Sequence, residues 1–281
     1  MEWSGPIVDN HCHLGGPQGR GIEAVEDFVE AGGTHLIVIN KPSWSFGVEV
    51  ETGRDFRHGF EATCAMATEA STILPGKAWA ILGVHPALIS RLVDDRGMSV
   101  AAAGDLMREG ITVAAEYVRD GRAIGLKSGR PHYPVDDAVW TESNAVMAHA
   151  FEHAASIDCA VQLHTEEGTS FDDITTSAEA AGLSRSRVVK HFAEGPVDGP
   201  VPSVIARKEA LIDIGESDMP FLMETDYLDD PDRPGAVLGP KTIPRRVRWL
   251  AQEGYQDALA QSHVHTPEQV YDIEMAFTDD A

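Results

Sequence analysis

The sequence contains little cysteine, little lysine and no long apolar run. Its three cysteines are widely separated and no Cys-x-x-Cys occurs, which argues against a disulfide framework or a zinc ribbon. No segment approaches the ~20 apolar residues of a membrane span, and the first residues lack the pattern of a secretory signal. We therefore expect a cytoplasmic protein with reduced thiols and no association with membranes.

Basic residues are also scarce. Lysine and arginine together number 22 against 45 acidic residues, for a net charge of −23, and only 6 of the 22 are lysines. An acidic, lysine-poor surface keeps a protein soluble at high salt through self-repulsion, which predicts a halophilic cytoplasm. The same charge disfavours a protein that coats nucleic acid. A nucleic acid would be bound only as a substrate, where metal ions attract its phosphates.

The sequence does contain a regular alternation of strand-like and helix-like segments, the pattern of βα units around a parallel sheet. The predicted strands cover residues 7–13, 35–40, 78–84, 123–127, 159–164, 188–191, 211–214 and 221–226. Eight strands in one alternation predict an α/β protein with a TIM (β/α)8 barrel, a fold that commonly takes roughly 250 residues. Residues 1–281 are expected to form a single domain. An open doubly wound sheet is the alternative, although no glycine-rich turn follows the first strand.

The first predicted strand ends in His11-Cys12-His13. Side chains two residues apart on a strand share a face, so His11 and His13 project together while Cys12 points away. Two imidazoles that converge at a strand end can hold a divalent metal ion. The pair alone could be coincidence, because the chain has 12 histidines. Whether His11 and His13 belong to a metal site therefore depends on the residues at the other strand ends.

The active site of such a barrel lies at the carboxyl ends of its strands. Metal-capable side chains end the first, fourth, fifth, sixth and eighth predicted strands. They are His11 and His13, Lys127, His164, His191 and Asp226. One such histidine alone would be read as a satisfied core residue. Because barrel strands are normally apolar along their length, the whole set predicts a metal site.

Four neutral imidazoles and one carboxylate can hold two divalent ions when a bridging anion separates the ions. Imidazole-rich sites favour zinc, with manganese, cobalt, nickel and iron as alternatives. A charged lysine between two dications would be strongly destabilised. We therefore expect Lys127 to be N-carboxylated, with its carbamate bridging both ions. The alternative is a lysine that points elsewhere, beside a single metal ion.

The neighbouring polar residues suggest further roles. Asp226 is expected to accept the proton of the attacking water. Glu224, on the same strand face, is expected to support the metal ligands through hydrogen bonds, with a buried structural acid as the alternative. His85, which ends the third strand, and Arg130 and His132, in the fourth loop, are expected to bind a phosphate or another oxyanion. For these three, a loop salt bridge or a helix cap is the structural alternative.

The ordered ligand set resembles the metal-dependent amidohydrolase superfamily, and several segments resemble its TatD group. These segments are Val8-Asp9-Asn10-His11-Cys12-His13, Gly83-Val84-His85-Pro86 and Met223-Glu224-Thr225-Asp226, while residues 32–42, 129–133 and 234–241 resemble the archaeal TatD-related branch. The resemblance spans nearly the whole chain and implies a metal-bearing TIM barrel in a group generally described as deoxyribonucleases. Lys127 departs from the glutamate usual in TatD enzymes and resembles the carboxylated lysine of phosphotriesterases and related lactonases. This departure weakens the assignment as a nuclease, and both a nuclease-like and a phosphoesterase-like activity remain open.

Together these inferences predict a hydrolase in which a metal-bridged hydroxide cleaves an ester bond, with a phosphoester as the first choice. Hydrolysis of a lactone or an amide is the closest alternative. A barrel protein that binds metal without catalysis is the alternative from a different functional class. The expected partner is a small-molecule or phosphoester substrate, and a homo-oligomer is compatible with the sequence.

Overall fold

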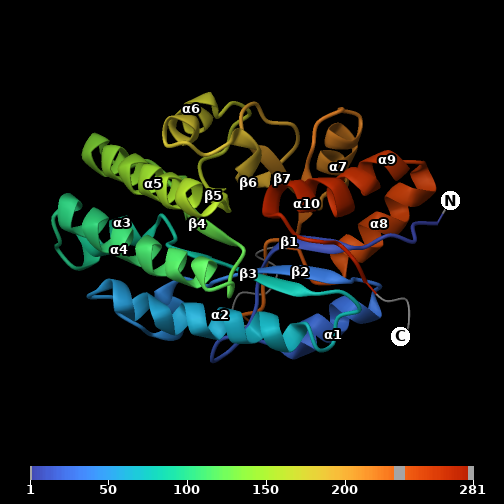
Figure 1. The fold of residues 1–281 in the computed structure, drawn as a ribbon, viewed down its shortest axis with the longest axis horizontal. Helices are drawn as coiled ribbons and strands as arrows, with labels where there is room; N and C mark the ends of the chain where they lie inside the picture. The colour runs from blue at the N-terminus through green and yellow to red at the C-terminus, as the bar shows by residue number, and fades with distance from the viewer. Residues whose placement is uncertain (1, 231–237, 278–281) are drawn as a thin grey trace.

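The computed structural model describes residues 2–230 and 238–277, which form one curled parallel sheet with helices packed around it (Figure 1). The strands are β1 (Val8–His13), β2 (His35–Ile39), β3 (Ala78–Gly83), β4 (Gly125–Gly129), β5 (Ala160–His164), β6 (Val188–Ala193), β7 (Val201–Ile205), β8 (Leu222–Glu224) and β9 (Tyr227–Leu228). The α-helices are α1 (Ile22–Glu30), α2 (Arg57–Ala70), α3 (Leu88–Ser90), α4 (Val100–Arg119), α5 (Asp137–Ile157), α6 (Asp172–Ala180), α7 (Lys208–Gly215), α8 (Thr242–Glu253), α9 (Gln256–Ala260) and α10 (Thr266–Tyr271).

The sheet closes on itself. Each strand from β1 to β8 pairs in parallel with the next strand along the chain. β9, which directly continues β8, pairs with β1, with Cys12 opposite Tyr227. The closure extends to the residue between them, because Asp226 N donates to His11 O at 3.0 Å. The predicted TIM barrel is therefore confirmed, and the open doubly wound sheet is wrong.

The strands are buried on both faces, as expected for a parallel sheet covered by helices. The larger apolar layer lies between the sheet and the helices, and the smaller one fills the barrel interior. The interior layer includes Val8, Ile37, Ile81, Val189, Leu222 and, from α10, Val270 and Tyr271. This packing leaves the polar residues at the carboxyl ends of the strands to form the site.

The seventh strand was predicted in the wrong place. Residues 211–214, expected as a strand, lie in α7, whereas the seventh strand is β7, Val201–Ile205. A short apolar run does not distinguish a strand from a buried helix segment. In α7, Leu211 and Ile214 are buried while Ile212 is 37% exposed, which is a helical pattern. β7 contains Pro202 and Ser203, residues that weaken the sequence signal of a strand.

An irregularity in β1 shapes the interior. The register of β1 against β2 shifts between Asp9 and Cys12. As a result the side chains of both Asn10 and His11 reach across the barrel, to β7 and β5 respectively. Cys12 packs in the outer apolar layer, as predicted.

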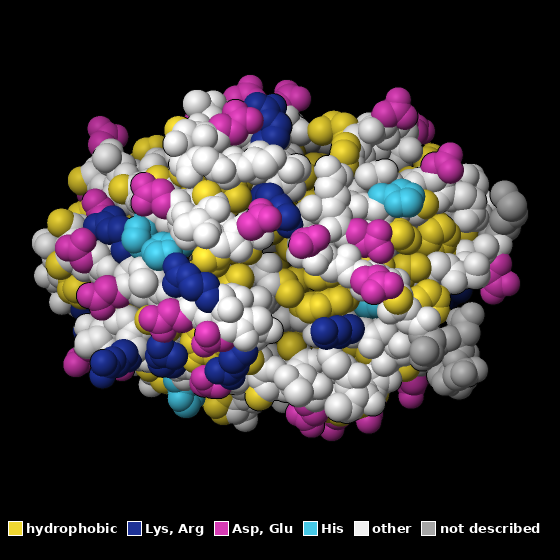
Figure 2. Space-filling model, viewed as in Figure 1, with side chains coloured by type: hydrophobic (Ala, Val, Ile, Leu, Met, Phe, Trp, Pro, Cys, Tyr) yellow, Lys and Arg dark blue, Asp and Glu magenta, His cyan; other side chains and the backbone are white. Residues whose placement is uncertain are grey.

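The surface carries the excess of negative charge. Asp and Glu side chains spread over the whole face seen in Figure 2, with Lys and Arg side chains among them. Several charged side chains of the protein form ion pairs, such as Arg20 with Asp27 at 2.8 Å. Among the described residues, no helix is long and apolar enough to cross a membrane.

Candidate metal centre

The predicted ligands converge at the carboxyl ends of the strands. His13, Lys127, His164, His191 and Asp226 line one cavity of about 350 Å³. The sixth, His11, is fully buried beside them, and its Nε2 lies 3.2 Å from His13 Nε2. Strands far apart in the sequence thus bring together the whole set that the sequence predicted.

The distances suit a shared metal ion. Asp226 Oδ1 lies 3.8 Å from His11 Nε2, 3.6 Å from His13 Nε2 and 3.9 Å from His191 Nε2. Two donor atoms that each lie ~2.1 Å from one ion are at most ~4.2 Å apart. Each nitrogen is therefore close enough to Asp226 to bind an ion together with it.

Hydrogen bonds orient the first two imidazoles. His11 Nδ1 lies 2.6 Å from Gln162 Oε1, and His13 Nδ1 lies 2.9 Å from Ile39 O. Both partners are acceptors only, so each histidine carries its hydrogen on Nδ1. The lone pair on Nε2 is then directed at the centre, which is how metal-binding histidines are usually held.

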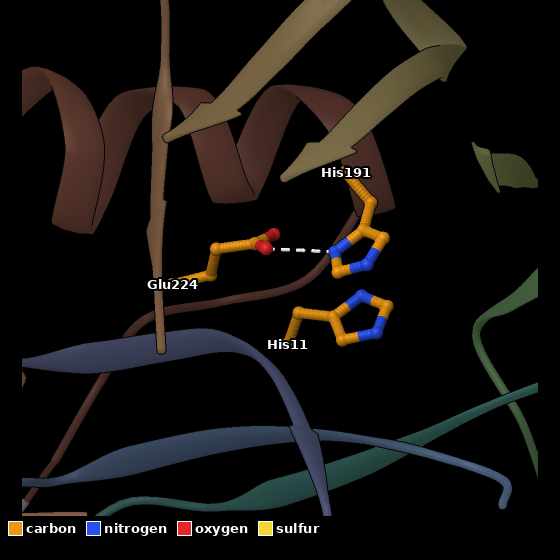
Figure 3. A group of neighbouring side chains, drawn as sticks. All are labelled: His11, His191 and Glu224. Atoms are coloured by element: carbon orange, nitrogen blue, oxygen red, sulfur yellow. Dashed lines mark ion pairs between the residues drawn. The ribbon is translucent and has the colours of Figure 1, made fainter. Parts of the chain in front are cut away.

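Glu224 lies directly against His191 (Figure 3). His191 Nδ1 lies 2.7 Å from Glu224 Oε1, and the ring stacks on His11 at a centroid distance of 3.6 Å. Glu224 is fully buried, accepts from Phe192 N at 3.0 Å and also accepts from the Ser203 hydroxyl. The structure thus places Glu224 behind a predicted ligand, which is the supporting position expected from the sequence.

The imidazoles are in the protonation state that metal binding needs. Burial holds the pKa of His11, His13 and His191 well below its usual value, and lowers the pKa of His164 to about 3. All four are therefore neutral at physiological pH. Neutral imidazole is the form that binds a metal ion, so no proton has to be displaced.

Lys127 differs from an ordinary lysine. Its side chain is buried, points into the cavity, and has its pKa lowered to about 8 by burial. Within the described part of the chain, its Nζ makes no hydrogen bond. A buried amine that makes no hydrogen bond, among neutral imidazoles and near the carboxylates of Asp226 and Glu224, fits a position where a group is added to the nitrogen.

Asp226 has an unusual backbone. It lies between β8 and β9 with φ of 49°, in the left-handed region that side chains other than glycine rarely adopt. Aspartate tolerates this region better than most residues. Local strain of this kind gathers at functional sites, and here it places the carboxylate beside the imidazoles of β1 and β6.

The residues predicted to bind substrate do not all reach the cavity. His85 and His132 line it, and His132 Nδ1 lies 2.8 Å from His164 Nε2. Arg130 is buried nearby but does not line the described part of the cavity. Its guanidinium pairs with the carboxylates of Glu166 and Asp173. Arg130 therefore links the loop after β4 to the loop after β5 and to α6. Its direct contact with a substrate is not supported.

Two residues that hold the ligands in place, Gln162 and Asp9, were not predicted from the sequence. Gln162 lies two residues before His164 on the same face of β5, and this polar residue in a buried strand was an available signal. Asp9 accepts from His11 N at 3.2 Å and from Thr225 N at 3.1 Å, which joins β1 to the end of β8. Burial raises the pKa of Asp9 to about 7.

A family model and one relative match this chain over most of its length. A family model described as TatD related DNase matches residues 8–202. An uncharacterized protein of Methanocaldococcus jannaschii is 34% identical over an alignment of 286 positions. The alignment covers 96% of this chain and 97% of the relative. The segment 234–241, which resembles the archaeal branch, falls partly on residues 234–237, outside the described residues.

Solved structures share the fold. A mutant of an organophosphorus hydrolase from Deinococcus radiodurans aligns with a TM-score of 0.63 at 16% identity, covering 95% of this chain and 93% of that chain. A TatD-like protein from Archaeoglobus fulgidus aligns with a TM-score of 0.56 at 13% identity, covering 95% and 100%. A TatD homologue from Escherichia coli aligns with a TM-score of 0.55 at 16% identity, covering 95% and 98%. At these identities the likeness is one of fold.

Proposed function

The chain belongs to the TatD-related DNase family, and we propose that it is a metal-dependent hydrolase that cleaves an ester bond in a small molecule. One observation carries the proposal. Four neutral imidazoles and a buried lysine from β1, β4, β5 and β6, and a carboxylate from the link between β8 and β9, meet around one cavity. Such a set matches the chemistry of a two-metal hydrolytic site.

His11, His13 and Asp226 fit one divalent ion, because their donor atoms all lie within 4.8 Å of one another. A second ion would be held by His164 and His191, whose ring centroids are 5.5 Å apart. Bound divalent ions supply a lowered pKa for the attacking water and polarise the scissile bond. Asp226 would take up the proton that the water loses as it attacks, because its carboxylate faces the same space as the imidazole nitrogens.

Lys127 would join the two ions as a carbamate. A neutral lysine amine adds to carbon dioxide: the N–C bond forms, one C=O electron pair moves onto oxygen, and a proton leaves the nitrogen for water. The product carries a negative charge and two oxygen donors. Burial, the missing hydrogen-bond partner of Nζ and the position on the cavity wall support this assignment.

The cavity favours a small substrate. Its volume of about 350 Å³ is at the low end for small-molecule sites. Pro42, Trp44, Phe192 and Leu228 form an apolar part of its wall. Of the described residues that line it, Lys127 is the sole lysine or arginine. A polynucleotide would need more cationic contacts than this.

Two ester classes fit this cavity. A phosphoester is the first candidate, because the proposed pair of ions can hold a phosphoryl group between them. A carboxylic ester such as a lactone is the second candidate. It is favoured by the apolar wall and by Arg130, which is held by Glu166 and Asp173 and not offered to an anion.

A substrate panel separates these candidates. Bis-nitrophenyl phosphate, a lactone and nitrophenyl acetate would each be tested with manganese, zinc or cobalt, and the chelator-treated protein would serve as the control. We expect metal-dependent turnover of at least one compound, and the preferred compound identifies the ester class. Absence of metal-dependent turnover on all three would favour a binding protein over an enzyme.

A further inference from the structure

A chain of buried hydrogen bonds joins the last described helix to the proposed metal centre. It starts at Tyr271, the final residue of α10, which packs in the apolar interior of the barrel. The Tyr271 hydroxyl donates to Asn10 Oδ1 at 2.8 Å and accepts from Gln162 Nε2 at 2.8 Å. One hydroxyl thus fixes two side-chain amides, on β1 and on β5.

The first branch ends at His11. Gln162 Nε2 donates to Asn10 O at 3.1 Å as well as to Tyr271, so the amide nitrogen faces away from the centre. Gln162 Oε1 is consequently turned to His11 Nδ1, at 2.6 Å. An amide oxygen can only accept, which keeps the hydrogen of His11 on Nδ1 and the lone pair on Nε2.

The second branch ends at His191. Asn10 Nδ2 donates to Ser203 Oγ at 2.9 Å, because Asn10 Oδ1 is occupied by Tyr271. The Ser203 hydroxyl donates to Glu224 Oε2. The other oxygen of the same carboxylate lies 2.7 Å from His191 Nδ1. The first branch therefore ends in a hydrogen bond on the Nδ1 of His11, and the second ends in a carboxylate that lies against His191.

We propose that Tyr271 is a positioning residue of the metal centre, which sets the tautomer of His11 through the first branch and holds the Glu224 carboxylate beside His191 through the second. The inference rests on the proposed function. Asn10 and Gln162 are at most 1% exposed, so protein groups and not bulk water determine how their amides are turned. Without the hydroxyl, the Gln162 amide can rotate and present its NH₂ group to His11 Nδ1. That arrangement requires the opposite tautomer and removes the lone pair from Nε2.

The test is Tyr271→Phe, which removes only the hydroxyl. Tyr117→Phe is the matched control, because Tyr117 is also buried but donates to Glu61 at 2.6 Å, away from the cavity. The zinc dissociation constant of each protein would be measured by competition with a chelator. Loss of groups that orient metal ligands typically weakens binding about 10–100-fold. We expect that loss for Tyr271→Phe and wild-type affinity for Tyr117→Phe.

Thermal unfolding of the metal-free proteins distinguishes positioning from support of the fold. A lower melting temperature for Tyr271→Phe with an unchanged zinc dissociation constant would overturn the inference. Long-range ¹H–¹⁵N spectra of the unmodified metal-free protein give a second readout that needs no variant. Hydrogen on Nδ1 of His11 is expected, and hydrogen on Nε2 of His11 would overturn the inference. Absence of zinc binding by the unmodified protein would overturn the proposed function together with this inference.

Discussion

Asparagine in place of Asp226 is expected to lower metal-dependent turnover by about 10²–10⁴-fold, the range for loss of a general base. Loss of a charged metal ligand would add to this effect. The fold should be retained, because asparagine tolerates the left-handed backbone of this position as well as aspartate does. Steady-state kinetics with saturating zinc would measure the turnover. Circular dichroism of both proteins would show whether the fold is retained.

Asp105→Asn is the control for this substitution. Asp105 is an exposed aspartate of α4 that pairs with Arg108 at 2.7 Å, outside the cavity. It makes the same change of charge without touching the centre, so its turnover should match that of the unmodified protein. Full metal-dependent turnover by Asp226→Asn would show that Asp226 takes no part in the reaction.

Methionine in place of Lys127 is expected to reduce the bound metal from two ions per chain to one. The carbamate proposed to join the ions needs the lysine amine, and methionine fills much of the same buried space without it. The metal-free protein should stay folded, because no described hydrogen bond of Nζ is lost. Elemental analysis of protein separated from free metal by gel filtration gives the number of ions.

Lys190→Met is the matched control. Lys190 is the buried lysine of β6, and its Nζ donates to His191 O at 2.7 Å and lies over the ring of Phe171. It does not line the described part of the cavity. This variant is expected to keep two ions. Two ions in Lys127→Met would show that the lysine does not bridge them.

The sequence allowed the barrel and the set of candidate ligands to be predicted. Apolar runs that end in a histidine, a lysine or an aspartate place those side chains at one end of a parallel sheet, whatever the path of the chain between them. This is why His11, Lys127, His164 and His191 could be expected to meet. The wrong position of the seventh predicted strand did not change the set of predicted ligands, because no ligand was assigned to that strand.

Other features could not be predicted from local patterns. Tyr271 and Gln162 are 109 residues apart, and their contact depends on which side chains face each other across the barrel interior. Periodicity does not contain that information. Arg130 looked available for a substrate because the partners that hold it, Glu166 and Asp173, belong to the next loop and helix. The residues that hold a site's side chains in place are therefore harder to predict from the sequence than the metal ligands themselves.

A crystal structure of the zinc-loaded protein, with anomalous scattering to locate and count the ions, is the decisive test of the two-metal centre. We expect two zinc peaks, one beside His11, His13 and Asp226 and one beside His164 and His191. Density extending beyond Lys127 Nζ should lie between the two peaks. A single ion beside an unmodified lysine amine, or no ion at these residues, would contradict the two-metal centre.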